Sequence, residues 1–287
     1  MKKIDLVFRD FEEFLKKSAP NVPSFHPNYE AALWEMVLNG GKRFRPKLLL
    51  SVVASYKAEN LRSAFAPALA LEILHTYSLI HDDLPLMDNA SLRRGCVTLH
   101  KKYDEVLAIL AGDGLNTQAF YLISTAQLKP KIKIKLVESL SYNGGIYGMV
   151  LGQALDCYFE GRKLPLEQLE IIHLNKTAKL IAASLEMGAI IAECDKKVRK
   201  SLYQLGLDLG LFFQIRDDVI DATQSAQEAG KTTYNDGAKN SYVNLLGLEG
   251  AKDSAKLLQD SILRQIKIFN KRAQNHLKTL LSSYFIF

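Results

Sequence analysis

The sequence has few of the residues that build disulfide frameworks and zinc sites. Only three cysteines occur among 287 residues, at positions 96, 157 and 194, and none forms a CxxC pair. Disulfide-rich domains and zinc modules need paired cysteines at short spacing. Neither kind of scaffold is therefore predicted.

Long apolar runs are also missing. No run of 18 or more apolar residues, the length that crosses a bilayer, occurs in the chain. The N-terminus, Met1 to Asp5, leads into a charged amphipathic segment without the apolar centre of a signal peptide. No stable membrane insertion is expected, and a cytoplasmic location is predicted.

Charge of either sign is only weakly in excess. The chain carries 37 Lys and Arg against 31 Asp and Glu, and the basic residues are dispersed apart from short runs such as 129–135. A nucleic-acid-binding surface concentrates basic residues with aromatic ones on one face. We therefore expect no nucleic-acid partner, whereas a small anionic substrate is compatible with this charge.

Strand-like alternation is absent, and nearly every segment shows helical periodicity. The composition, 48% apolar and 24% charged, is typical of a soluble globular protein. No linker or change of composition divides the chain, which predicts one all-α domain over residues 1–287. Helices are expected at roughly 2–17, 28–38, 42–56, 61–80, 103–127, 131–159, 166–192, 195–222 and 240–284.

An aspartate cluster follows a strongly apolar segment. The chain reads Asp82-Asp83-Leu84-Pro85-Leu86-Met87-Asp88 directly after residues 61–80. Proline removes a backbone donor and clashes with the preceding turn, so the buried helix should end or bend here. Arg93 and Arg94 follow closely and could simply pair with the carboxylates.

A second cluster, FFQIRDDVID at 212–221, repeats the apolar lead-in and the three aspartates. Asp217 and Asp221 share a helix face, where like charges repel by roughly a few tenths of a kcal/mol. A lone DDxxD motif is an exposed acidic patch about as often as it is a metal site. Two oxygen-rich clusters without a Cys/His set favour a hard cation such as Mg2+. Substrate phosphate oxygens usually complete the shell of that ion, which predicts a diphosphate ligand.

Short motifs along the chain resemble, in their order, those of the trans-prenyltransferases (isoprenyl diphosphate synthases), above all bacterial farnesyl diphosphate synthases. Any one motif is weak, but two aspartate clusters with the basic motifs in this order are highly specific. The motifs are GGKRFRP at 40–46, HTYSLIHDDLPLMD at 75–88, LRRG at 92–95, AGD at 111–113, GQALD at 152–156, NKT at 175–177, FFQIRDDVID at 212–221, GKTTYND at 230–236 and NLLGLE at 244–249.

The resemblance implies an isoprenoid synthase-type bundle of long helices around a deep central cavity, usually in a homodimer. It implies that an allylic diphosphate, dimethylallyl or geranyl, is ionised with Mg2+ and that isopentenyl diphosphate attacks the carbocation before a proton is lost. Clustered carboxylates, a metal ion and several cations are what the departure of diphosphate requires.

The resemblance also implies roles for residues of this sequence. The metal ligands would be Asp82, Asp88 and Asp217, with weaker or indirect contributions from Asp83, Asp218 and Asp221. The allylic diphosphate would be held by Arg93, Lys176, Lys231 and Lys239, and isopentenyl diphosphate by Lys42, Arg45, His75 and Arg94. The groups at the reacting centre would be Lys176 together with the neutral oxygens of Thr177 and Gln214, and the side chain beside the isoprene tail would be Phe213.

Other polar residues in these motifs are expected to be structural. A lone histidine on an apolar helix is more often a core residue, and the motif match alone favours binding by His75. His81 is predicted to be structural. Gln153 and Asp156, three residues apart, are predicted to form a buried polar pair that supports the site.

The expected product follows from the residues before the first cluster. Tyr77 and Ser78 lie five and four residues before Asp82, where bulk closes the floor of the product cavity in this family. A rise of about 1.5 Å per residue places Tyr77 about 7.5 Å from Asp82 along the helix. An aromatic residue there resembles farnesyl (C15) synthases, so C15 is predicted, and a geranylgeranyl (C20) synthase is the alternative.

Two other classes share some of these features. A class I terpene cyclase would have the helical fold, but its second motif would be NDxxSxxxE-like, whereas Asn235-Asp236 is followed by Lys239 where serine should stand. A non-catalytic helical partner subunit would lack one or more of the polar groups, and none is lost here.

Overall fold

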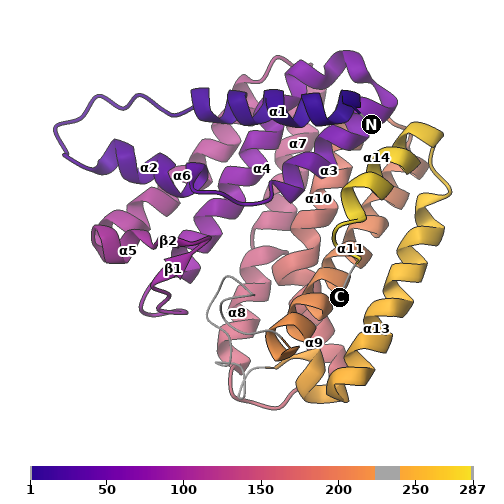
Figure 1. The fold of residues 1–287 in the computed structure, drawn as a ribbon. Helices are drawn as coiled ribbons and strands as arrows, with labels where there is room; N and C mark the ends of the chain where they lie inside the picture. The colour runs from indigo at the N-terminus through magenta and orange to yellow at the C-terminus, as the bar shows by residue number, and fades with distance from the viewer. Residues whose placement is uncertain (1, 224–239, 286–287) are drawn as a thin grey trace.

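A computed structural model describes residues 2–223 and 240–285 and confirms the all-α class. Long helices lie side by side, with α4 next to α3 and α6 and with α10 next to α11 (Figure 1). The helices are α1 Lys2–Lys17, α2 Tyr29–Leu38, α3 Phe44–Tyr56, α4 Leu61–Asp82, α5 Leu99–Lys102, α6 Glu105–Thr125, α7 Pro130–Gly144, α8 Met149–Phe159, α9 Leu166–His173, α10 Lys179–Ile191, α11 Lys196–Thr223, α13 Tyr242–Ile266 and α14 Lys271–Leu281, and a 3-10 turn covers Ala58–Asn60.

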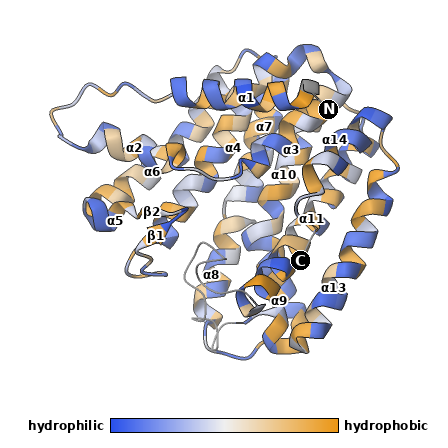
Figure 2. Cartoon of the chain, viewed as in Figure 1, coloured by the Kyte–Doolittle hydropathy of each residue, from blue (hydrophilic) through white to orange (hydrophobic). Residues whose placement is uncertain are grey.

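Helix α4 runs through the core and delivers the first aspartate cluster. Its residues from Ala68 to Leu74 are each no more than 2% exposed. Burial of apolar surface is worth about 25 cal/mol per Å², so this helix is held mainly by packing. Hydrophobic and hydrophilic residues alternate along the surrounding helices, as expected of helices around a core (Figure 2). The helix ends at Asp82, three residues before Pro85, as predicted.

The LRRG motif forms a small hairpin that the sequence analysis did not predict. Strands β1 (Leu92–Arg93) and β2 (Cys96–Val97) pair antiparallel, with Arg93 opposite Cys96. The two turn residues have positive φ, 55° at Arg94 and 78° at Gly95, which is the geometry of a tight two-residue hairpin turn. Strands of two residues are too short to show period-two alternation, so no pattern could reveal them.

The predicted helix 131–159 is wrong as a single element. It divides into α7 and α8, and the break falls at residues 145–148. A Cβ at Gly148 would lie 2.0 Å from the carbonyl oxygen of Asn143, so the chain turns tightly where only glycine fits.

The predicted helix 240–284 also divides, into α13 and α14. Asn270 caps α14, since its side chain accepts a hydrogen bond from Ala273 N at 2.8 Å. A further kink lies at Gly247, whose φ is 74°. The sequence pattern does not reveal the break or the kink, because the apolar periodicity continues across both.

A π-helical turn lies inside the predicted helix 166–192. Residues Leu174–Ala178 form this turn, η2, between α9 and α10. Helix α8 lies against it so closely that a Cβ at Gly152 would lie 2.0 Å from Lys176 N. Single π turns are rare and often occur at functional sites, and this one carries Lys176 and Thr177.

Two helices are long and apolar enough to cross a membrane by length and mean hydropathy alone. They are Ala58–Asp82, whose apolar window is 67% buried, and Glu105–Thr125, whose window is 39% buried. The first is the core helix α4. The second, α6, leaves part of an apolar face uncovered, including Val106 and Leu110.

Candidate active site

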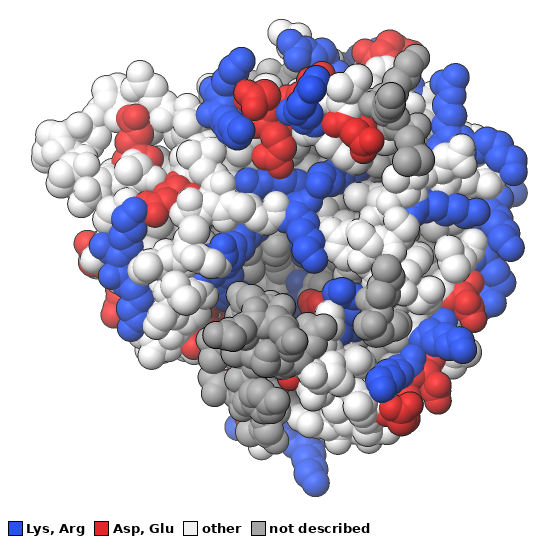
Figure 3. Space-filling model, viewed as in Figure 1, with Lys and Arg blue, Asp and Glu red and all other residues white. Residues whose placement is uncertain are grey.

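The described residues line a cavity of about 610 Å³. Polar side chains line part of it and apolar ones the rest, and they come from α3, α4, α6, α8 and η2. The face in Figure 3 is hollowed near its centre, and lysine and arginine side chains gather above the hollow. Among the lining residues are Arg45, His75, Tyr77, Ser78, Asp82, Gln153, Lys176 and Thr177.

Arg93 joins all three aspartates of the first cluster. Its Nε donates to Asp83 Oδ1 at 2.7 Å, and its Nη2 lies 3.9 Å from Asp82 and 3.8 Å from Asp88. The loop closes because Asp88 N donates to the Asp82 carbonyl at 2.9 Å. The simple pairing of carboxylates with an arginine therefore exists in this structure.

Burial alters the acidity of this cluster. It raises the pKa of Asp83 to about 6, although Arg93 acts in the opposite direction. Burial also raises the pKa of Asp82. Asp83 is 1% exposed and its Oδ2 has no hydrogen-bond partner. A buried, unsatisfied carboxylate oxygen beside two further carboxylates would gain from a cation.

The cluster's donors suit a hard cation. Among residues 2–223 and 240–285, no three His, Cys, Asp or Glu side chains form a compact metal-binding group. The oxygen-only set of Asp82, Asp83 and Asp88 nevertheless fits Mg2+, which keeps waters and takes phosphate oxygens as further ligands. The residues therefore fit a metal that a substrate would complete.

Helix α8 holds two site residues through Gln153 and Asp156. Gln153 Nε2 donates to Asp82 Oδ1, and Lys176 Nζ donates to Asp156 Oδ2 at 2.6 Å. Burial lowers the pKa of Lys176, but Asp156 and Asp82 outweigh it, so the net pKa lies above the usual value. Lys176 therefore stays cationic beside the first cluster. The two α8 side chains hold Asp82 and Lys176 in position.

Thr177, next to Lys176 in sequence, connects to the second cluster. Its hydroxyl donates to Gln214 Oε1 at 3.2 Å, and Gln214 Nε2 donates to Asp218 Oδ1 at 3.2 Å. The other Asp218 oxygen accepts from the backbone N of Tyr242 at 2.8 Å. The π turn thus lies between the two aspartate clusters, with Lys176 near the first and Thr177 bonded toward the second.

The three aspartates of the second cluster differ in environment. Burial raises the pKa of Asp218 to about 7, against its hydrogen bonds from Tyr242 and Gln214. Asp217 is exposed at 53%, with Arg216 Nη1 at 3.6 Å. Asp221 is half-buried. Asp218 therefore anchors α11 to the start of α13, and Asp217 faces outward.

A second group of cations lies at the Gly41–Pro46 motif. Burial and the neighbouring Arg45 and Arg94 charges push the pKa of His75 well below its usual value, which leaves the imidazole neutral. Burial lowers the pKa of Arg45 to about 10, and its Nε has no hydrogen-bond partner. Packed guanidinium groups with an unsatisfied donor form a site for an anion such as phosphate.

Gly41 is required for this group to form. Its φ is 97°, and a Cβ there would lie 2.9 Å from Arg94 Cζ. The Arg94 guanidinium donates to the carbonyl oxygens of Met36 and Gly40 at 3.3 and 3.4 Å. Lys42 Nζ lies 5.1 Å from the centre of the Tyr284 ring, a cation–π contact at the C-terminal end of the described chain.

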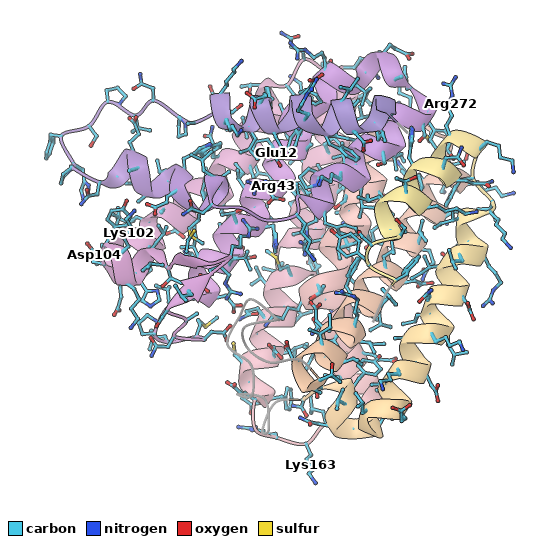
Figure 4. All side chains as sticks on the ribbon, viewed as in Figure 1. Glu12, Arg43, Lys102, Asp104, Lys163 and Arg272 are labelled. Carbon is cyan, nitrogen blue, oxygen red and sulfur yellow. The ribbon has the colours of Figure 1, made fainter. Side chains whose placement is uncertain are left out.

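Two residues that the sequence analysis missed support this group. Glu72, 3% exposed on α4, lies 3.0 Å from Arg43 Nη1 and 3.5 Å from Arg94 Nη2. Arg43 also approaches Glu12 of α1 at 3.2 Å, and the two side chains point toward each other in Figure 4. A charged residue inside an apolar helix was the available signal, because charges are almost never buried unless paired.

Of the remaining expected residues, some line the cavity and others do not. Tyr77 and Ser78 line the cavity. Phe213 instead packs edge to face on Phe44 at 4.6 Å and is not among the residues that line this cavity. Lys231 and Lys239 lie outside the described residues.

Comparisons with known proteins bear on the family and the fold of this chain. The family model described as "Polyprenyl synthetase" matches residues 26–280. A farnesyl diphosphate synthase of Micrococcus luteus is 41% identical over 96% of this chain and 94% of its own length. A chloroplastic geranylgeranyl pyrophosphate synthase of Capsicum annuum is 42% identical over 86% of this chain and 68% of its own length.

Solved structures extend the likeness to the fold. A crystal structure of a geranyltransferase from Helicobacter pylori, complexed with magnesium and isoprenyl diphosphate, superposes with a TM-score of 0.95 at 50% identity. It covers 99% of this chain and 97% of that one. Similarity of this extent over nearly the whole length establishes common descent, and the chain belongs to the polyprenyl synthetase family.

Proposed function

We propose that the protein is a short-chain isoprenyl diphosphate synthase. It condenses isopentenyl diphosphate with dimethylallyl and then geranyl diphosphate, head to tail, to give farnesyl diphosphate. The observation that carries this proposal is one cavity with both carboxylates and cations along its polar wall and with Tyr77 lining it as well. Two anion-binding groups beside one hydrocarbon-sized space are what joining two prenyl diphosphates requires.

The allylic diphosphate is bound beside the first aspartate cluster. Arg93 and Lys176 supply fixed positive charge, and Lys231 and Lys239 are proposed to join them. Asp82, Asp88 and Asp217, with help from Asp83, Asp218 and Asp221, would hold Mg2+, which would supply charge neutralisation for the leaving diphosphate. Arg93 already spans the first cluster, so binding exchanges its carboxylate partners for phosphate oxygens.

Isopentenyl diphosphate is bound by the second cation group, Lys42, Arg45, His75 and Arg94. The neutral His75 can donate one hydrogen bond without adding charge, whereas the two arginines meet phosphate oxygens in pairs. The Glu72 carboxylate, 3.5 Å from Arg94 Nη2, helps to hold the guanidinium of Arg94 in place. Binding of the anion removes the repulsion between these buried cations.

The carbocation forms near Thr177 and Gln214. The Thr177 hydroxyl proton is directed at Gln214 Oε1, so the lone pairs of Thr177 Oγ1 remain available to positive charge. A neutral oxygen stabilises a carbocation without forming a covalent bond to it. A carboxylate, in contrast, would capture the carbocation. The released diphosphate then accepts the proton lost on condensation. Phe213, on α11, is proposed to pack beside the isoprene tail.

Tyr77 limits the product to C15. Its ring lines the cavity one to one and a half turns before Asp82, where the growing chain passes along α4. A C20 product is the second candidate, because relatives named as geranylgeranyl synthases match nearly as well. Replacement of Tyr77 by alanine should lengthen the product, and unchanged C15 output would contradict its role as the floor.

The active form is proposed to be a homodimer in the cytoplasm, with each chain folded as a single domain over residues 1–287. The family model spans most of that length, which supports one domain. Three free cysteines suit a reducing compartment. An apolar strip on α6, formed by Val106, Ile109, Leu110 and Tyr121, is 42–66% exposed and suits a second copy.

The dimer is tested by light scattering of the purified protein. Leu110→Glu places a charge in the strip and should shift the mass from two chains to one, whereas Lys163→Glu, far from the strip in sequence, should leave it unchanged. A monomeric wild-type protein would contradict the proposal.

The reaction is tested by incubating the protein with Mg2+, isopentenyl diphosphate and either dimethylallyl or geranyl diphosphate. Chromatography of the dephosphorylated products should show farnesol. Geranylgeraniol as the main product would support the C20 alternative, a cyclic hydrocarbon would indicate a terpene cyclase, and no product would indicate a non-catalytic subunit.

A further inference from the structure

The imidazole of His81 occupies a notch between α4 and α6 that only glycine leaves open. A Cβ at Gly112 would lie 2.2 Å from His81 Nε2 and 2.5 Å from its Cδ2, well inside contact distance. The same Nε2 lies 3.1 Å from the carbonyl oxygen of Ile109 and 3.9 Å from Asp113 Oδ1. Residues of α6 therefore hold the ring on the side away from α4.

The other side of this ring contacts Tyr77. The two ring centres are 5.6 Å apart and the planes meet at 87°, an edge-to-face pair one helical turn apart. Both side chains line the cavity. Tyrosine on a helix chooses between staggered χ1 rotamers, so a neighbour that is itself fixed decides whether the phenol can swing aside.

We propose that His81, seated against Gly112, is a positioning residue that keeps the Tyr77 ring across the path of the growing prenyl chain and thereby sets product length. The proposal rests on the proposed function, since it concerns the floor of that same cavity. An aromatic floor stops elongation only if its side chain keeps its rotamer when the next isoprene unit is added. A tyrosine held only by its own rotamer preference changes rotamer more easily than one that packs against an imidazole fixed by α6.

The test measures the ratio of C20 to C15 products, which a merely structural role would not change. His81→Ala removes the edge contact, and Gly112→Ala displaces the imidazole from its notch. Each should raise the ratio about tenfold, the effect of losing one aromatic contact together with one hydrogen bond. Gly114→Ala is the matched control on the same helix, because its Cβ would meet only side-chain ends, Leu33 Cδ2 at 3.1 Å and Tyr29 Oη at 3.6 Å, and neither belongs to His81 or Tyr77. It should leave the ratio unchanged.

A double substitution separates an effect through Tyr77 from an independent one. Tyr77→Ala alone removes the floor, and adding His81→Ala should lengthen the product no further. Thermal unfolding, followed by circular dichroism, identifies a variant that fails to fold, and His81→Ala decides the question if Gly112→Ala is lost.

Two results would overturn the proposal. One is a folded His81→Ala that makes the wild-type ratio, and the other is a ratio that His81→Ala raises equally in the presence and absence of Tyr77. A wild-type protein that makes no prenyl product would instead overturn the proposed function.

Discussion

Each aspartate cluster has an adjacent pair and a third aspartate, six residues after the first aspartate in one (82–88) and four after it in the other (217–221), but their surroundings differ. In the first, a side-chain cation dominates, because Arg93 donates to Asp83 and approaches Asp82 and Asp88. In the second, Asp218 is held by the Gln214 side chain and the backbone N of Tyr242.

The middle aspartate of each cluster, Asp83 or Asp218, is therefore an anchor, and the two anchors differ in their partners. Asp83 is tied to an arginine that a diphosphate can attract, whereas Asp218 is tied to a backbone amide that no ligand can move. If the first cluster binds the diphosphate as proposed, it must rearrange its ion pairs when substrate arrives. In the second cluster, Asp217 is 53% exposed and lies 3.6 Å from Arg216 Nη1.

The largest expected difference concerns catalysis. Asp82→Ala should lower kcat about a thousandfold, because it removes one of the carboxylates proposed to hold the Mg2+ that would neutralise the leaving diphosphate. Asp218→Asn should lower kcat only about tenfold, since an amide oxygen can still accept from Tyr242 N. Steady-state assays with geranyl and isopentenyl diphosphate measure both, and equal losses would contradict the assignment of Asp218 as an anchor.

The two arginines should differ less strongly. Arg93→Gln should raise KM for the allylic diphosphate about thirtyfold, the effect of losing a charge-assisted hydrogen bond. Arg216→Gln, the matched change in the second cluster, should alter KM less than about threefold because the Arg216–Asp217 contact is long, at 3.6 Å, and Asp217 is exposed. A larger effect at Arg216 would show that the second cluster uses its own arginine in binding.

The smallest effect is a dependence of stability on pH. Asp218 has a folded pKa of about 7 against a usual value of 3.8, so the folded state binds its proton more tightly than the unfolded state does. Its stabilising contribution is thus present below pH 4 and is lost as pH rises through 7. Without metal or substrate, Asp218→Asn should flatten the fall in Tm between pH 5 and 8 relative to wild type, by a few degrees.

That experiment has an internal comparison. Asp83 has a pKa of about 6, so Asp83→Asn should flatten the curve over a lower range, mostly below pH 6. Identical curves for wild type and Asp218→Asn would show that Asp218 titrates normally in the folded protein.

The sequence predicted what depends on local pattern and on motif order. The apolar run before Asp82 predicts a buried helix, and α4 is that helix; Pro85 predicts its end. The cation-rich motif at 40–46 is predicted to bind phosphate, and the structure places the buried Arg45 near His75, whose pKa its charge lowers.

What could not be predicted depends on contacts between distant segments. Arg43 looked like one more member of a basic motif, yet it links Glu12 of α1 to Glu72 of α4. Gln153 and Asp156 looked like partners of each other, but each bonds to a different site residue. His81 is predicted to be structural, and its edge-to-face contact with Tyr77 could not be read from the sequence. Helix packing decides such pairings, and periodicity reports only which face is apolar.

The central claim is that both aspartate clusters hold one diphosphate. Isothermal titration of geranyl thiolodiphosphate, an unreactive analogue, in the presence of Mg2+ tests it with Asp82→Asn, Asp217→Asn and the double variant. Each single change should weaken binding at least about tenfold, and the double variant should be no weaker than the worse single one, since one shared metal–ligand unit is lost in either case. Wild-type affinity in Asp217→Asn would contradict the claim.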